Sequence, residues 1–303
     1  MLHAAIKWLL YLKCLNQWCD KVEKTNPKAI AESLSPLSRT ALSVLYGRVT
    51  NANLLRDPYS DPLGEKILRT LNYTQEPSFQ GVFIAVAPIR TKIIDEMVAK
   101  FTITNGNNIM VAELGCGLST RFERLADKKA ISPENVVWVN VDLPDMIALR
   151  KELWGMVSPA TADLQKLSPG SVFERGWIEF AKAHSRGINL ILAEGLLGYF
   201  EPDKINLFFD RLRDAFKGGE IILTTVHPMH KELERNPNST KHKHSWFARS
   251  GSEVANMAGF ELLEERHFFA PEYLNEDKVP KEVMTFIREM PPMYTGAVRL
   301  RIK

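Results

Sequence analysis

The sequence has few cysteines, and none of them stands in a recognisable pattern. Its 303 residues include 3 cysteines, Cys14, Cys19 and Cys116, and no two of them have the CxxC spacing. Sparse, unclustered cysteines exclude a disulfide scaffold and give no support to a zinc site, so we expect no metal. So low a count fits a reducing compartment, and we expect a cytoplasmic protein.

Long runs of one kind of side chain are also missing. The formal net charge is +3 and no basic run alternates with aromatic side chains, which argues against nucleic acid as a partner. The apolar stretch at residues 8–12 lies between Lys7 and Lys13 and is far below the roughly 20 residues that cross a bilayer. We predict no integral membrane association. The N-terminus should form an amphipathic helix packed on the body or on a second subunit, with membrane-surface contact as the alternative.

Helical patterning dominates the chain before residue 108. Ser35 and Pro36 have the residue types of a helix N-cap and a first helical position. Residues 57–62 have the composition of a turn, and apolar side chains recur at helical spacing over residues 91–101. We therefore predict a helical N-terminal cap over residues 1–107.

From residue 108 onward, apolar runs alternate with amphipathic stretches, as in a parallel sheet with crossover helices. Two extended segments in the tail would suit a sheet of seven strands. We predict an α/β, Rossmann-like core with helices on both faces over residues 108–303, with a lid at about 227–250. The predicted strands are 109–114, 136–141, 188–193, 220–226, 260–269 and 297–302, and the predicted helices are 119–127, 145–153, 172–184 and 202–216.

The stretch VAELGCG, residues 111–117, joins the first predicted strand to a helix. Gly115 and Gly117 permit a sharp turn and let a ligand approach without a Cβ in the way. Asp142 closes the next strand, where a carboxylate can accept both hydrogen bonds of a ribose diol. Because open parallel sheets bind ligands at this edge, the two features together predict a nucleoside site. The alternatives are a structural turn for the glycines and a helix cap for Asp142.

Two nucleoside ligands compete for this site. A dinucleotide needs G-x-G-x-x-G to hold its pyrophosphate, but Thr120 stands where the third glycine would be, and Glu113 precedes the loop. A nearby carboxylate disfavours a pyrophosphate and favours the cationic groups of S-adenosylmethionine. The residues therefore favour S-adenosylmethionine over NAD, and an NAD oxidoreductase stays as the lesser alternative.

The motifs ELGCG, STR (residues 119–121), VDLP and LAEGLLGYF together resemble those of the leucine carboxyl methyltransferase family. LSPLSRTALSVLYGR and APIRTKIIDEMV resemble the N-terminal region of its small-molecule, polyketide O-methyltransferase branch, and the likeness runs from Leu34 to the C-terminus. The resemblance implies a class I methyltransferase fold with a helical cap. It also implies S-adenosyl-L-methionine as donor, S-adenosyl-L-homocysteine as product and a small-molecule acceptor.

The same resemblance implies roles for single residues. Arg90 would pair with the donor's carboxylate, Glu194 would meet its ammonium group, and Tyr199 would lie beside the reaction centre. Ordinary structural roles remain as alternatives: a surface salt bridge with Asp95 or Glu96 for Arg90, a paired structural glutamate for Glu194, a core position for the tyrosine and a helix cap for Asp163. The implied cofactor-binding residues are Arg90, Glu113, Gly115, Gly117, Asp142 and Leu143, the adenine-contacting pair Asp163 and Leu164, and Glu194.

A base is needed only for some acceptors. A carboxylate is ionised at neutral pH, whereas a phenol of pKa about 10 is helped by a base. His227 is the preferred candidate because it directly follows a predicted strand, and His230, His242 and His244 lie in the same polar segment. Arg48 could reach the site from the cap or be an ordinary exposed arginine.

We predict an S-adenosylmethionine-dependent O-methyltransferase that acts on a carboxylate or hydroxyl of a small molecule. A protein C-terminal carboxyl methyltransferase and a donor-binding protein without turnover stay as alternatives. The residues do not identify the acceptor, and they leave open whether the N-terminal helix mediates a homodimer.

Overall fold

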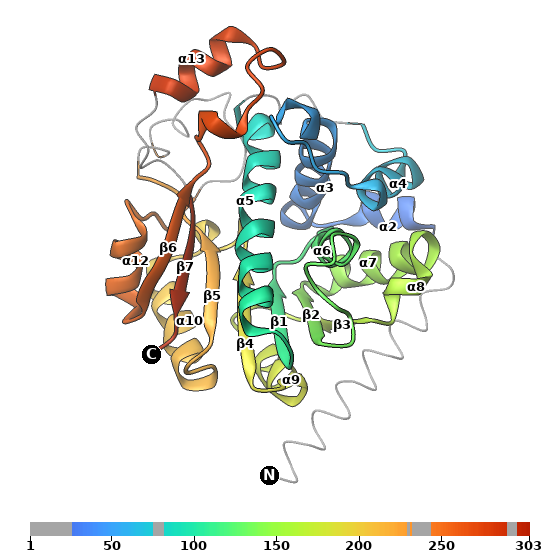
Figure 1. Ribbon diagram of the computed structural model, residues 1–303. Helices are drawn as coiled ribbons and strands as arrows, with labels where there is room; N and C mark the ends of the chain where they lie inside the picture. Colours follow the sequence, from blue (N-terminus) through green and yellow to red (C-terminus); the bar gives the residue numbers. More distant parts are fainter. Residues whose placement is uncertain (1–25, 75–81, 229–230, 232–243, 290–295) are drawn as a thin grey trace.

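The computed structural model describes residues 26–74, 82–228, 231, 244–289 and 296–303. Figure 1 shows a twisted sheet with helices on both faces and a further group of helices, α2 to α4, beside the β1–β3 end of the sheet. The helix predicted near the N-terminus lies outside the described residues, as do His230 and His242.

In the described part of the chain, the sheet contains seven strands in the order β3-β2-β1-β4-β5-β7-β6. The first five strands are parallel, and β7 is antiparallel to both of its neighbours. The predicted seven-strand α/β sheet is confirmed. The strands are β1 (Ile109–Leu114), β2 (Val136–Asp142), β3 (Gln165–Pro169), β4 (Ile188–Ala193), β5 (Glu220–Thr224), β6 (Glu261–His267) and β7 (Gly296–Arg301).

The strand order reverses between β1 and β4. After β3 the chain returns to the other side of β1 and continues outward through β4 and β5. In open α/β sheets, ligands bind at such a reversal, outside the carboxyl ends of the strands. The glycine loop directly follows β1 and Glu194 directly follows β4, so the topology brings both to this edge.

Helices cover both faces of the sheet (Figure 1). Apolar side chains of α9, α10 and α12 pack on one face, and those of α5 and α6 pack on the other. The helices are α2 (Pro27–Ser33), α3 (Pro36–Thr50), α4 (Pro62–Leu71), α5 (Val82–Asn105), α6 (Arg121–Asp127), α7 (Pro144–Val157), α8 (Pro159–Ala162), α9 (Gly176–His184), α10 (Pro202–Ala215), α12 (Gly251–Ala258) and α13 (Lys281–Glu289), with single turns η1 (Ala52–Leu54), η3 (Leu197–Tyr199) and η4 (Pro271–Tyr273).

The helix α5 is longer than the predicted span of residues 91–101 and continues through Pro88. Its apolar side chains, such as Ile93 and Met97, pack on the same face of the sheet as Val111. A helix enclosed on most sides is held mainly by tertiary packing, which overrides the weak local signal of a proline. The position of α5 matters for the site because its buried Asp95 accepts from Arg121, the first residue of α6.

The helices α2 to α4 pack on α7 through a shared apolar cluster. The predicted start of α3 is confirmed, since the Ser35 hydroxyl accepts from the Ser38 amide at 3.2 Å. The Ser35 amide and Ser38 hydroxyl also donate to Asp145 of α7 at 3.2 and 3.1 Å. On the far side, Leu55 forms a β-bridge with Leu274. The division into a cap at 1–107 and a core at 108–303 stays a prediction.

Among the described residues, no helix has both the length and the apolar character that crossing a bilayer would require.

Candidate functional site

The loop between β1 and α6 needs glycine at two positions. Gly115 and Gly117 have φ angles of +61° and +47°, values that favour glycine because it lacks a Cβ. A Cβ on Gly115 would lie 2.9 Å from Leu196, in the segment after β4, and one on Gly117 would lie 3.0 Å from the Cβ of Ala41 in α3. The loop therefore runs close to both the cap and the end of β4.

Asp142 is bonded to this loop. Its carboxylate accepts from the Gly117 amide and from the Leu143 amide, both at 2.7 Å. The N-cap of α7 is Leu143 and carries no side-chain cap bond, so Asp142 organises the glycine loop instead of capping the helix. Burial raises the pKa of Asp142 to about 6, although the two amide hydrogen bonds act in the opposite direction.

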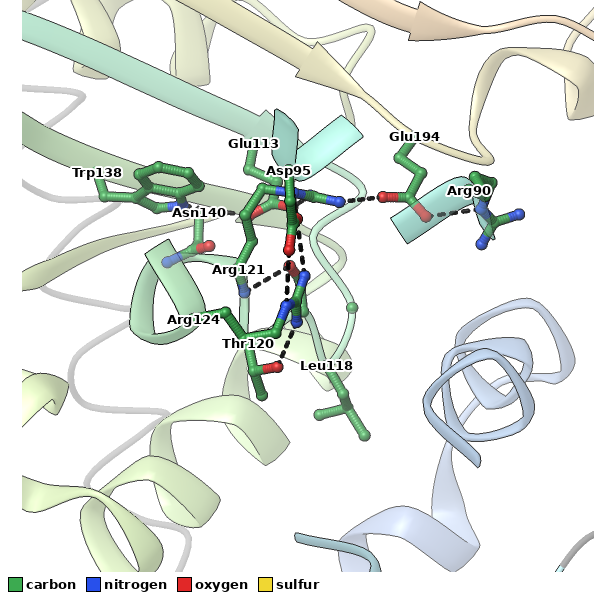
Figure 2. Close-up of polar contacts among 12 residues, drawn as sticks. Arg90, Asp95, Glu113, Leu118, Thr120, Arg121, Arg124, Trp138, Asn140 and Glu194 are labelled. Carbon is green, nitrogen blue, oxygen red and sulfur yellow. Dashed lines mark hydrogen bonds and ion pairs between the residues drawn. The ribbon is translucent and has the colours of Figure 1, made fainter. Parts of the chain in front are cut away.

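Glu194 and Arg90, predicted to bind the two ends of the donor's amino acid group, form an ion pair with each other. The Arg90 Nε donates to Glu194 at 2.7 Å, and the other Glu194 oxygen accepts from Arg121. Figure 2 shows Glu194 between these two guanidinium groups. Burial alone would raise the pKa of Glu194, but the charges of Arg90 and Arg121 lower it to about 2.

The side chain of Glu113 extends from the face of the sheet and not from the carboxyl edge at which the glycine loop lies. It shares its face of β1 with Ile109 and Val111, because side chains alternate along a strand. That face lies under α6, and both Glu113 oxygens are used there, one by Arg121 and the other by the Trp138 indole at 3.1 Å. Glu113 thus lies beneath the loop as a partner of Arg121.

Arg48 is a buried cap residue, with 5% of its surface exposed. It donates to Asp61 at 3.0 Å and, at 3.1 Å, to the carbonyl of Leu118, the residue after Gly117. Thr120 in turn donates to Asp61 at 2.7 Å. Of the two alternatives for Arg48, the geometry excludes the exposed arginine and ties the cap to the loop.

Asp95, in α5, lies between Arg121 and Arg124 and connects these two arginines of α6. It accepts from Arg121 at 2.8 Å and, through both its oxygens, from Arg124 at 2.8 and 2.9 Å. Arg124 also donates a hydrogen bond to the Thr120 hydroxyl at 2.6 Å. The alternative of a surface salt bridge between Arg90 and Asp95 is wrong, because Asp95 is buried and pairs with Arg121 and Arg124 while Arg90 pairs with Glu194. The sequence did not predict this set of residues. The available signal was an aspartate within the otherwise apolar repeat of α5, where an unpaired charge would be costly.

Asp163 and Leu164 lie apart from the other predicted residues. They precede β3, at its amino end, and both are exposed. The strand pairing aligns Gln165 with Trp138, in the middle of β2, and Pro169 with Asp142. The structure therefore places the pair at the edge opposite to Gly117 and Asp142.

The two predicted catalytic residues, Tyr199 and His227, have different surroundings. Tyr199, in η3 after β4, stacks on His244 with ring centroids 5.0 Å apart. His227 is buried, and both its burial and the charge of Arg249, just before α12, lower its pKa. The ring that stacks on Tyr199 is therefore that of His244. In the described part of the predicted lid, the Ser245 and Trp246 amides donate to the Gly198 carbonyl at 2.8 and 3.2 Å, which fixes this placement.

The chemistry of the edge fits S-adenosylmethionine. The ion pair of Arg90 and Glu194 offers one charge of each sign to a zwitterionic amino acid group, and Asp142 offers a carboxylate to a ribose diol. Glycine at positions 115 and 117 allows the positive φ angles with which the loop turns at this edge. Within the described residues, no three metal-ligating side chains gather in a way that could hold an ion.

Comparison with known proteins gives a family match. The model of the leucine carboxyl methyltransferase family matches residues 39–213, more than half of the chain. The tetracenomycin polyketide synthesis O-methyltransferase TcmP of Streptomyces glaucescens is 26% identical over 200 residues, 64% of this chain and 68% of that protein. The S-adenosyl-L-methionine-dependent methyltransferase dpfgK of Gibberella zeae is 24% identical over 202 residues, 62% of this chain and 66% of that protein.

A solved structure from Thermobifida fusca YX, assigned provisionally as a methyltransferase, shares the fold. It superposes with a TM-score of 0.52 at 18% identity and covers 85% of this chain and 94% of that one. The fold is that of class I methyltransferases, as predicted.

Proposed function

The chain belongs to the leucine carboxyl methyltransferase family, and we propose that it methylates an oxygen atom of a small-molecule acceptor. The family match and the two relatives indicate an S-adenosylmethionine-dependent methyltransferase. The observation that carries the proposal is the bond between Asp142 and the glycine loop, at the same edge as the ion pair of Arg90 and Glu194. The O-methyltransferase named among the relatives supports oxygen as the acceptor atom.

Orientation is the main contribution of the residues at this edge. S-adenosylmethionine, when bound, supplies an electrophilic methyl group. Asp142 would accept from the ribose, Arg90 would meet the carboxylate, and Glu194 would meet the ammonium group. Holding two reactants in line reaches effective molarities of roughly 10⁵–10⁸ M in favourable cases. A carboxylate acceptor needs nothing more, whereas a hydroxyl acceptor also has a proton to lose.

We infer that His244 takes that proton. It lies beside Tyr199, and a Cβ on Gly198 would come within 2.6 Å of its ring. Both neighbours belong to the segment that follows Glu194 in the sequence. We assign His244, in preference to His227, as the base for a hydroxyl acceptor.

The proposal is tested first by calorimetric titration of the wild-type protein with S-adenosylhomocysteine, followed by transfer of a labelled methyl group to a panel of acceptors. The panel contains phenolic polyketides, small aromatic carboxylates and a peptide ending in leucine. We expect micromolar binding and transfer to a phenol. An absence of product binding would overturn the methyltransferase assignment, transfer to the peptide alone would favour the protein-directed alternative, and binding without any transfer would favour the alternative without turnover.

His244→Asn is expected to lower kcat with a phenolic acceptor by about 10²–10⁴-fold, the usual contribution of a general base. The Kd for S-adenosylhomocysteine should stay within about 3-fold, because the groups proposed to hold the donor are those of Asp142, Arg90 and Glu194. His227→Asn serves as the comparison, since that histidine is buried beside Arg249. A greater loss of kcat in His227→Asn than in His244→Asn would contradict the assignment.

A further inference from the structure

Arg121 binds three separate carboxylates with a single guanidinium group. Its side chain is almost completely buried, with 1% of the residue exposed. Nε donates to Asp95 at 2.8 Å, one terminal nitrogen donates to Glu113, and the other donates to Glu194. These partners come from α5, β1 and the end of β4, so one side chain joins three elements (Figure 2).

Two of the three partners are themselves fixed. Asp95 also accepts from Arg124 at 2.8 Å, and Glu113 also accepts from the Trp138 indole at 3.1 Å. The guanidinium is planar and its donors keep a rigid fork geometry. Two buried anchors therefore set the direction of the third donor, which points at Glu194.

Glu194 is the partner nearest to solvent. Its side chain is 16% exposed, whereas those of Asp95 and Glu113 are 7% and 4% exposed. It is also the only one of the three that Arg90 contacts among the described residues. The buried part of the network therefore ends in a carboxylate at the candidate donor site.

We propose that Arg121 is a positioning residue of the donor site, which holds Glu194 in the orientation that receives the amino group of the methyl donor. This inference rests on the proposed function. Arg121 acts through Glu194 and does not itself touch the donor. Its positive charge also helps to keep the Glu194 carboxylate ionised, in agreement with the lowered pKa of that group.

The arrangement leaves Arg90 available for the other end of the donor. Arg90 uses Nε for Glu194, and its two terminal nitrogens face Gly195, where a Cβ would lie 3.6 and 3.8 Å from them. Because Arg121 holds one oxygen of Glu194, Arg90 need not carry that carboxylate alone. Its terminal nitrogens can then meet the donor's carboxylate.

Arg121→Lys tests the proposal. Lysine keeps the positive charge, but its single ammonium group cannot reproduce the fork that reaches three carboxylates. We expect the Kd for S-adenosylhomocysteine to rise by about 10-fold or more, as when a hydrogen bond to a charged group is lost. The KM for S-adenosylmethionine should rise in parallel, while kcat at saturating donor stays within about 3-fold. Arg299→Lys is the matched control, because Arg299 is also buried and paired, with Glu220 at 2.6 Å.

A double-mutant cycle with Glu194→Gln separates positioning from a general loss of stability. If Arg121 acts through Glu194, Arg121→Lys should change the Kd by less than about 2-fold in the Glu194→Gln background, because the two effects are coupled. Equal effects of Arg121→Lys in both backgrounds, or an unchanged Kd in the single variant, would overturn the proposal. A wild-type protein that does not bind S-adenosylhomocysteine would instead refute the proposed function.

Should Arg121→Lys prove unfolded by circular dichroism, Glu194→Asp tests the same point. Aspartate keeps the charge but draws the carboxylate back from Arg121. The proposal expects a loss of affinity of about 10-fold, and a Kd within about 2-fold of the wild type would overturn it.

Discussion

Asp142→Asn is expected to weaken S-adenosylhomocysteine binding by about 100-fold at pH 7.5 and at the same time to stabilise the ligand-free protein. The loss of affinity follows because asparagine removes the charge from two ribose hydrogen bonds, each worth about 1.5–3 kcal/mol when the acceptor is ionised. Asparagine still offers one oxygen to the Gly117 amide, so the glycine loop should keep its shape. Its amide nitrogen cannot accept from the Leu143 amide, however, and this offsets part of the gain in stability. Calorimetric titration of the wild type and the variant measures the difference.

The gain in stability follows from the raised pKa of Asp142, which is about 6 in the folded protein against a usual 3.8. Between these two values the folded state binds more protons than the unfolded state, so stability falls as the pH rises through this window. Above it, the ionised carboxylate costs about 2–3 kcal/mol. Thermal denaturation of ligand-free Asp142→Asn should therefore show a higher Tm than the wild type at pH 7.5, and little difference at pH 4.

The loss of affinity and the gain in stability of Asp142→Asn can be checked against each other. A variant that loses both affinity and stability at pH 7.5 would indicate a disturbed loop and contradict the role given to Asp142. In the wild type, protonation of this carboxyl removes its capacity to accept two ribose hydrogen bonds. The affinity for S-adenosylhomocysteine should therefore decrease as the pH falls below about 6, and the variant should lack this dependence.

Asp95→Asn is expected to cost about 3–5 kcal/mol of the free energy of unfolding, the range found when one partner of a buried ion pair is removed. Asp95 is 5% exposed and is bonded to Arg121 and Arg124, which are 1% and 3% exposed. Asparagine would leave two buried guanidinium groups short of a counterion. Urea denaturation should show a lower midpoint with an unchanged m value.

The control for Asp95 is an exposed pair on a cap helix. Glu65 and Arg69 of α4 lie 3.5 Å apart, with side chains 54% and 72% exposed. Glu65→Gln should change stability by less than about 0.5 kcal/mol, because water screens exposed ion pairs. Similar losses in both variants would mean that burial of the network contributes little.

Most of the sheet could be predicted from local patterns. The bounds of β1 and β4 agree with the prediction because each is a mostly apolar run with a glycine within two residues of its end. The strand β3 was not among the predicted strands, since QKLSP, residues 165–169, has neither an apolar run nor a clear alternation. Its pairing with β2 holds it in place, and a single-segment pattern does not contain that information.

In the candidate site, only the residues at the ends of predicted strands could be located from the sequence. Gly117, Asp142 and Glu194 lie at the same edge of the sheet because each stands at or just after the carboxyl end of a parallel strand. The placement of Asp163 relied on a short motif whose position depends on where β3 begins, and that strand was not predicted. The direction of Glu113 depends on the alternation of side chains along β1, which points it under α6.

The cap cannot be completed until the chain around Leu274 has been synthesised, because Leu55 forms its bridge with that residue. Most of the chain separates these two positions, so the contact closes a very long loop, and such contacts form late. At about 5–20 residues per second, a nascent chain would wait on the order of tens of seconds between making Leu55 and making its partner. During that interval the apolar surface that the segment around Leu274 covers is exposed, so we expect unfinished chains to be clients of chaperones.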